Sequence, residues 1–173
     1  MNIVLIGMSG AGKSTLGVLL AKALGMDFVD TDIVIQQQEG RLLQDIIDQD
    51  GIETFMEIEE RIVSELQLDH CVIATGGSVV YSEKAMNALQ RGGTIVYLHV
   101  PYDEIERRLL NIATRGIVIK KGKRLKDVYE ERAPLYMKYS DQTVDCSDKD
   151  IELCVYEIIK NVQARHGEHT TNG

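Results

Sequence analysis

Short apolar runs alternate with longer segments of helical period along this chain. Residues 2–6 and 71–75 are nearly continuous apolar runs, as in strands that are buried on both faces. Further strands are predicted at 27–29, 94–100 and 143–146. Because helix-length segments separate these runs, the pattern indicates βαβ units around a parallel sheet that is covered by helices on both faces.

The segments between the strands predict helices that are bounded by glycine or proline. A helix is predicted over 13–24, ending at Gly25, and the helical pattern over 31–68 is broken at Gly40 and Gly51. The remaining helices are predicted over 82–91, from Pro101 to about Leu110, over about 125–137 and over 150–164. This pattern predicts one domain over residues 1–165 and a polar C-terminal tail over 166–173.

Composition and charge narrow the class of protein. The chain has 173 residues, of which 44% are hydrophobic, and this suits one globular domain. Its net charge of −8 disfavours a nucleic-acid partner. The three cysteines form no CxxC pair, and no segment approaches the roughly 20 apolar residues that a membrane span needs. We therefore expect a cytoplasmic monomer without nucleic-acid or membrane partners.

Residues 7–14 read GMSGAGKS and match the pattern G-x-x-x-x-G-K-[ST] between a strand and a helix. In this arrangement, backbone N–H groups and the positive end of the helix surround a phosphate. We expect ATP or GTP, with Lys13 neutralising the β- and γ-phosphates and the Ser14 hydroxyl ligating Mg²⁺. The expected nucleotide-binding residues of this loop are Gly10, Ala11, Gly12, Lys13, Ser14 and Thr15.

Two carboxylates favour a kinase over other nucleotide-binding proteins. The chain has no N-K-x-D sequence for reading guanine, and the strand predicted at 71–75 ends without the acidic pair of a motor ATPase. Asp30 and Asp32 follow the strand predicted at 27–29, and their spacing can direct one toward Mg²⁺ and the other toward an acceptor hydroxyl. An aspartate at this place also suits the N-cap of a helix, so the spacing leaves both roles open.

Five motifs follow one another along the chain: IGMSGAGKSTLG, FVDTDIVI, IATGG, YLHV and ERAPLY. Together they resemble the shikimate kinase family over roughly residues 2–146. The resemblance implies a three-layer α/β P-loop kinase fold with a five-stranded parallel sheet and helices on both faces. It also implies MgATP-dependent phosphorylation of a ring hydroxyl.

The resemblance assigns roles to the residues that surround an acceptor. Asp30 would support the metal through water, and Asp32 would contact the acceptor hydroxyl as the candidate base. Gly76 and Gly77 would offer backbone N–H groups to the acceptor. Arg132, in the ERAPLY motif, would bind the acceptor's carboxylate.

Two further arginines match the nucleotide side of the family. Arg108 would lie against adenine, and Arg115 would close over the transferring phosphate from a lid at about 112–124. Enzymes of this type exclude water by closing such loops.

The pattern departs from the family at the second carboxylate-binding arginine. The family's F-R-x-x-E is here Phe55-Met56-x-x-Glu59, and Ser78 stands where the family has a third glycine. Losing a bidentate arginine should weaken carboxylate binding roughly 10- to 100-fold. Shikimate is the leading acceptor. The alternatives are a related kinase for a sugar acid, an amino alcohol or a nucleoside monophosphate, or a regulatory ATP-binding module without an acceptor.

Overall fold

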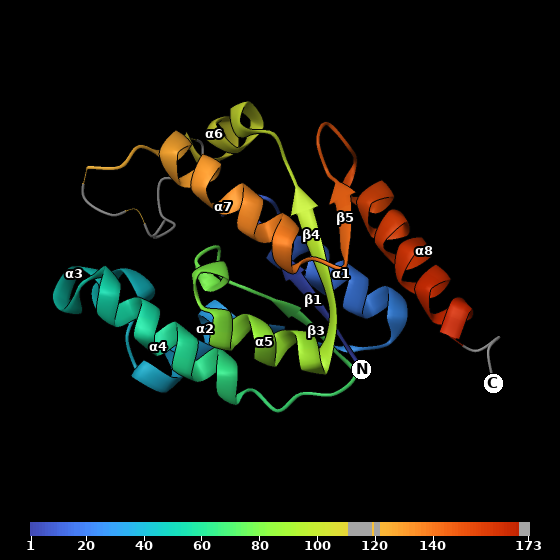
Figure 1. Cartoon of the computed structure of the whole chain (residues 1–173), viewed down its shortest axis with the longest axis horizontal. Coiled ribbons are helices and arrows are strands. Elements are labelled where there is room, and N and C mark those ends of the chain that lie inside the picture. The colour runs from blue at the N-terminus through green and yellow to red at the C-terminus, as the bar shows by residue number, and fades with distance from the viewer. Residues whose placement is uncertain (111–118, 120–121, 170–173) are drawn as a thin grey trace.

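Five parallel strands form one sheet in the order β2-β3-β1-β4-β5 (Figure 1). The computed structural model describes residues 1–110, 119 and 122–169, the last five by their backbone alone. The strands are β1 (Asn2–Ile6), β2 (Asp27–Asp30), β3 (Cys71–Ala74), β4 (Gly93–His99) and β5 (Gln142–Asp145). The predicted parallel α/β sheet is confirmed, and each strand lies within two residues of its expected place.

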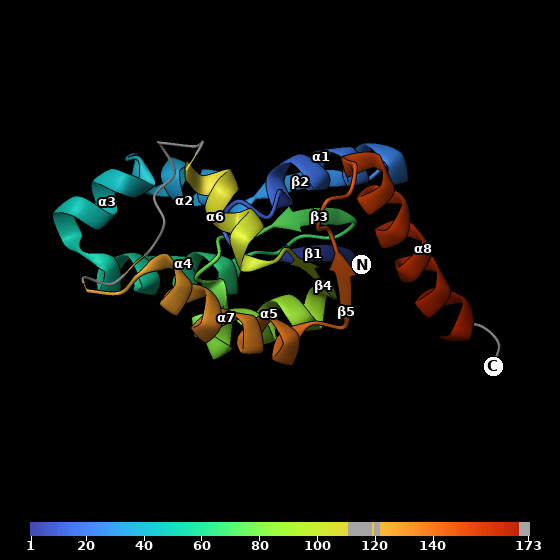
Figure 2. The same cartoon turned by 90° about the horizontal axis from the view of Figure 1, so that it is seen from above.

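The described part of the chain also has eight α-helices and one 3₁₀ helix, η1 (Val79–Tyr81); all but the last α-helix lie between strands. The α-helices are α1 (Lys13–Leu24), α2 (Thr31–Glu39), α3 (Leu43–Asp50), α4 (Ile52–Glu65), α5 (Glu83–Gly92), α6 (Tyr102–Leu110), α7 (Leu125–Tyr139) and α8 (Ile151–His169). Helices α1 and α8 cover one face of the sheet, and α5 and α7 cover the other (Figure 2). The predicted three-layer arrangement is therefore confirmed.

Helix ends agree with the glycine pattern, with one exception at the C-terminus. Gly25 and Gly40 follow α1 and α2 in the left-handed conformation, which glycine adopts without steric cost. Helix α8 continues through residues 166–169, which were expected to belong to a polar tail. The apolar period marks only the turns that pack on the domain, whereas backbone hydrogen bonds can extend a helix beyond them.

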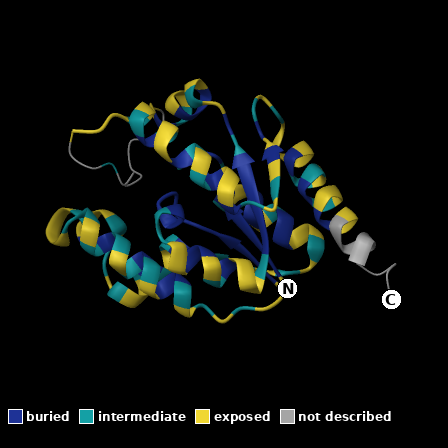
Figure 3. Cartoon of the chain, viewed as in Figure 1, coloured by how far each residue is buried: buried dark blue, intermediate teal, exposed yellow. Residues whose placement is uncertain are grey.

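The core lies between the layers and includes nearly all of β1 and β4 (Figure 3). Leu5 on the central strand is fully buried and pairs with Ala74 of β3 and Val96 of β4. A second cluster of Ile35, Ile46, Phe55 and Ile62 holds α2, α3 and α4 together. Among the described residues, no helix combines the length and hydropathy that a bilayer crossing requires.

Shortening Leu5 should show how much packing of the central strand contributes to the stability of the fold. We expect Leu5→Ala to lower the free energy of unfolding by about 2–5 kcal/mol, because it opens a cavity where the structure cannot collapse. Leu153→Ala is the control: this α8 side chain is 46% exposed, and its loss should change stability by less than about 0.5 kcal/mol. Urea denaturation measures both, and equal losses would contradict the core placement of Leu5.

Candidate active site

The loop between β1 and α1 forms a phosphate cradle at the carboxyl end of the sheet. Gly7 has a φ of 146°, and a Cβ there would lie 2.8 Å from the carbonyl oxygen of Leu98, so the loop requires glycine at this position. Lys13 opens α1, and its Nζ donates to the carbonyl oxygens of Gly7 at 2.7 Å and Met8 at 2.8 Å. The lysine ammonium therefore lies within the cradle.

Ser14 and Asp30 form a polar pair beside the cradle. The Ser14 hydroxyl donates to Asp30 Oδ2 at 2.6 Å, and Asp30 Oδ1 accepts the backbone N–H of Asp32 at 3.0 Å. Asp30 is thus the N-cap of α2 and also the partner of Ser14, so the two roles left open by the spacing are compatible. A hydroxyl and a carboxylate suit Mg²⁺, which commonly takes few protein ligands and completes its shell with phosphate and water. The pair fits this metal.

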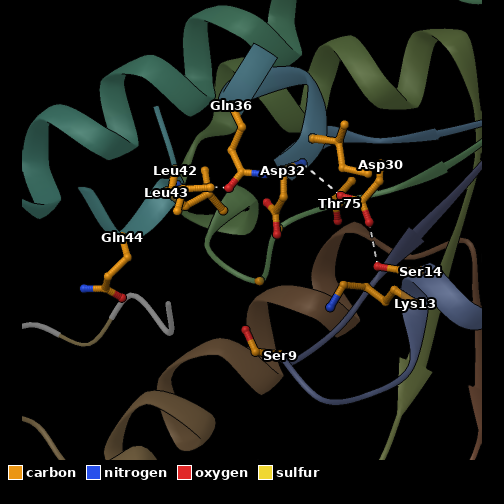
Figure 4. Close-up of a pocket in the computed structure, with 13 residues that line it drawn as sticks. Ser9, Lys13, Ser14, Asp30, Asp32, Gln36, Leu42, Leu43, Gln44 and Thr75 are labelled. Carbon is orange, nitrogen blue, oxygen red and sulfur yellow. Dashed lines mark hydrogen bonds between the residues drawn. The ribbon is translucent and has the colours of Figure 1, made fainter. Parts of the chain in front are cut away.

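A cavity of about 440 Å³ extends from the cradle toward α2 and α3. Figure 4 shows the Asp32 carboxylate and the Lys13 ammonium pointing toward the same space, with Ser9 at its edge. Apolar side chains of Ile33, Leu42 and Leu43 also line the cavity. A ligand here would meet opposite charges at one end and an apolar wall at the other.

The predicted acceptor residues meet in a smaller pocket that shares Asp32, Gly76 and Gly77 with this cavity. Arg132 of α7 reaches the pocket although it is only 1% exposed. Its Nη1 lies 3.0 Å from the position that a Cβ at Gly77 would occupy. The guanidinium also stacks on the Tyr81 ring, with its carbon 5.1 Å from the ring centroid. The structure therefore brings Asp32, the glycine pair and Arg132 together.

Two side chains that the sequence did not indicate hold the glycine pair. The Gly76 N–H donates to Thr31 Oγ1 at 3.2 Å, so this amide, expected to face the acceptor, is engaged by the protein. The Tyr136 hydroxyl donates to the Gly77 carbonyl at 2.7 Å. Tyr136 lies one turn after Arg132 on α7, and this spacing in ERAPLY is the signal that could have revealed it.

Ser78, which follows the glycine pair and departs from the family pattern, pairs with a buried acid. Its hydroxyl donates to Glu59 Oε2 at 2.6 Å. Glu59 is 2% exposed, and burial raises the pKa of its carboxyl to about 7. The charge of Asp32 acts in the same direction as burial, whereas the Ser78 hydrogen bond lowers this pKa. The serine that replaces a glycine is therefore part of the acceptor side of the site.

Met56 lies beside the acceptor pocket. It packs on the second hydrophobic cluster and lines a neighbouring pocket of about 220 Å³. The other residues of that pocket are Glu53, Glu57, Glu60, Tyr81 and Ser82. Tyr81, whose ring lies beneath the Arg132 guanidinium, is thus shared between the lining of this pocket and the surroundings of the acceptor arginine. A direct contact of Met56 with the acceptor stays a prediction.

Arg108 braces the cradle. Its guanidinium donates to the carbonyl oxygens of Gly10 at 3.2 Å and Ala11 at 3.4 Å, and it pairs with the carboxylate of Glu104. Its expected contact with adenine stays a prediction. Arg115 and most of the expected lid at about 112–124 lie outside the described residues.

A nucleotide cradle that opens onto a second pocket with its own carboxylate and arginine is the arrangement of a P-loop kinase for a small acceptor. The family model described as shikimate kinase matches residues 9–163. The shikimate kinase of Pseudomonas paraeruginosa is 37% identical over 166 residues, covering 94% of this chain and 96% of the relative. The chain belongs to the shikimate kinase family, whose members are ATP-dependent kinases that phosphorylate a hydroxyl group.

Solved structures agree with this assignment. Shikimate kinase from Acinetobacter baumannii in complex with shikimate matches with a TM-score of 0.87 and 28% identity, covering 95% of this chain and 93% of that chain. Shikimate kinase from Aquifex aeolicus matches with a TM-score of 0.79 and 30% identity over the whole of both chains. The expected P-loop kinase fold is thereby confirmed.

Removing the Tyr136 hydroxyl should test its hold on the acceptor loop. We expect Tyr136→Phe to lower the free energy of unfolding by about 1–3 kcal/mol, because the buried Gly77 carbonyl loses a donor. The KM for the acceptor should rise, while the KM for ATP should not change. Tyr156→Phe, at a side chain of α8 that is 63% exposed, is the control. The hydroxyl has no such role if the two variants match in denaturation and kinetics.

Proposed function

We propose that this enzyme transfers the γ-phosphoryl group of MgATP to a ring hydroxyl of shikimate. The observation that carries the proposal is the placement of Arg132 beside Asp32 across the Gly76–Gly77 loop. A buried arginine can bind a carboxylate through two parallel hydrogen bonds, and this orients the acceptor as well as holding it. An acceptor that carries both a carboxylate and a nearby hydroxyl would satisfy both groups.

Different residues of the chain then have different roles in the phosphoryl transfer. Asp32 accepts the proton as the hydroxyl oxygen forms its bond to the γ-phosphorus and the bond to ADP breaks. Lys13 neutralises the phosphates, and the Gly77 N–H helps to hold the acceptor. Bound Mg²⁺ would be held by Ser14 and, through water, by Asp30, and it would supply charge neutralisation at the phosphates.

The roles of the other two arginines are proposals on the nucleotide side. Arg108 would lie against adenine, from a position where it already contacts the cradle carbonyls. Arg115 would reach the transferring phosphate from the lid.

Met56 favours a second candidate within the same family. An apolar side chain in place of an arginine removes one cation from the surroundings of the acceptor. The second candidate is therefore a kinase for another hydroxylated acceptor, such as a sugar acid, an amino alcohol or a nucleoside monophosphate.

ADP release with shikimate, with a panel of other small alcohols and without an acceptor separates the candidates. We expect turnover that depends on shikimate, and Asp32→Asn should lower kcat by about 10²- to 10⁴-fold, because the proton acceptor is lost. Nucleotide affinity, measured by calorimetry, should be unchanged in this variant. Turnover only with another alcohol would select the second candidate, and the absence of any acceptor-dependent turnover would favour an ATP-binding module. Full activity of Asp32→Asn would remove Asp32 as the base.

Restoring an arginine at position 56 tests the cost of the substitution. We expect Met56→Arg to lower the KM for shikimate roughly tenfold or more, because a charge-assisted hydrogen bond is added. The kcat should change little, since the cradle and Asp32 are untouched. Met56→Leu keeps the wall apolar and should behave as the parent enzyme. An unchanged KM in Met56→Arg would show that Met56 does not limit acceptor binding.

A further inference from the structure

Glu59 is a buried carboxyl group directly behind the acceptor loop. Among the described residues, its only hydrogen-bond donor is the Ser78 hydroxyl, which reaches Oε2, and Oε1 has no hydrogen-bond partner. A Cβ added at Gly76 would collide with Oε1, so this oxygen lies against the loop that contacts the acceptor. The group therefore has an unused oxygen at the acceptor side of the site.

A second carboxylate flanks the same glycine. Asp32 Oδ1 lies 3.0 Å from the position of the added Gly76 Cβ, and Glu59 Oε1 lies closer still to that position. The charged groups that face Glu59 are Asp32 from α2, Arg132 from α7 and Lys13 from α1. The negative charge of Asp32 disfavours a second negative charge at Glu59, whereas the two cations favour it.

Within the described part of the chain, no cation forms an ion pair with Glu59. Met56 lies three residues earlier on α4, where helical side chains are neighbours, and it is apolar. A buried carboxylate without a paired cation is costly, and the group responds by keeping its proton. Burial accordingly raises the pKa of Glu59 to about 7.

We propose that Glu59, paired with Ser78 in place of a cation, is a positioning residue whose charge sets how tightly the acceptor site holds a carboxylate. The inference rests on the proposed function, because it assumes that Arg132 binds the acceptor's carboxylate. When Glu59 is neutral, the charge of Arg132 is offered to the acceptor. When Glu59 is ionised, it competes for that charge and repels the incoming carboxylate through the Gly76 loop.

The direction of the pH effect follows from the charge of each form. Glu59 is neutral below its pKa and ionised above it, so the affinity for a carboxylate acceptor falls as the pH rises through neutrality. A unit charge a few ångströms from the carboxylate should raise the KM for shikimate roughly tenfold across the transition. The KM for ATP should change much less, because Lys13 of the cradle acts on Glu59 more weakly than Asp32 and Arg132 do.

The KM values for shikimate and ATP, measured between about pH 6 and pH 9, test the proposal. We expect Glu59→Gln to keep the low shikimate KM throughout, because glutamine holds the Ser78 hydrogen bond without a charge. Ser78→Ala should move the midpoint to higher pH, since it removes the hydrogen bond that favours the ionised form. Glu60→Gln is the matched control: Glu60 also accepts a serine hydroxyl, from Ser82 at 2.6 Å, and its loss should leave the pH dependence intact.

A carbon NMR titration of labelled glutamate carboxyl groups measures the ionisation of Glu59 directly, in the absence of an acceptor. One resonance should titrate near neutral pH in the parent protein and be missing in Glu59→Gln. The proposal is overturned if no such resonance exists, or if Glu59→Gln keeps the parent pH dependence of the shikimate KM. If Glu59→Gln is too unstable to assay, the midpoint shift in Ser78→Ala decides in its place.

The proposed function can be wrong even if the role of Glu59 is right, and the experiments distinguish the two. If shikimate does not bind at any pH, that function is wrong. The same pH series on the acceptor found in the panel, together with the titration, then decides the role of Glu59. A pH-independent KM for an acceptor that carries a carboxylate would overturn the role.

Discussion

One chain of hydrogen bonds connects the phosphate cradle to the candidate base. The Ser14 hydroxyl binds one oxygen of Asp30, and the other oxygen of Asp30 accepts the backbone N–H of Asp32. Because Ser14 is on α1 and Asp32 is on α2, these two bonds set the position of one helix against the other. The same oxygens suit Mg²⁺. The placement of Asp32 and the proposed binding of phosphate and Mg²⁺ therefore all depend on a single carboxylate.

The acceptor side depends on an equally constrained loop. Thr31 holds the Gly76 N–H, Tyr136 holds the Gly77 carbonyl, and Ser78 binds Glu59 behind the loop. These partners come from different helices, so the loop is fixed from several directions and its small residues leave space on the open side. Preorganisation of this kind keeps a site in its productive geometry before the ligand arrives.

Charge is arranged unevenly across this site. Lys13 and Arg132 are the cations that line its two pockets, while the carboxyl groups of Asp32 and Glu59 both lie against Gly76. Met56 adds no charge, although the family resemblance places an arginine there. Glu59 accepts a hydrogen bond from the Ser78 hydroxyl, and burial raises the pKa of its carboxyl. The two departures from the family pattern, at positions 56 and 78, are thus neighbours of one buried acid.

The local pattern of residues was enough to predict the strands, most helix ends and the cradle of residues 7–14, because apolar period and glycine content act over a few residues. The pairings across the acceptor loop were decided by tertiary structure alone. Tyr136 and Gly77 are 59 residues apart, and Ser78 and Glu59 are 19 apart, so only the packing of α7 and α4 against η1 brings them together. Packing also placed Met56 in a neighbouring pocket that Tyr81 lines as well. The side chains that meet in a site depend on how whole helices pack against one another. A short stretch of sequence does not determine that packing.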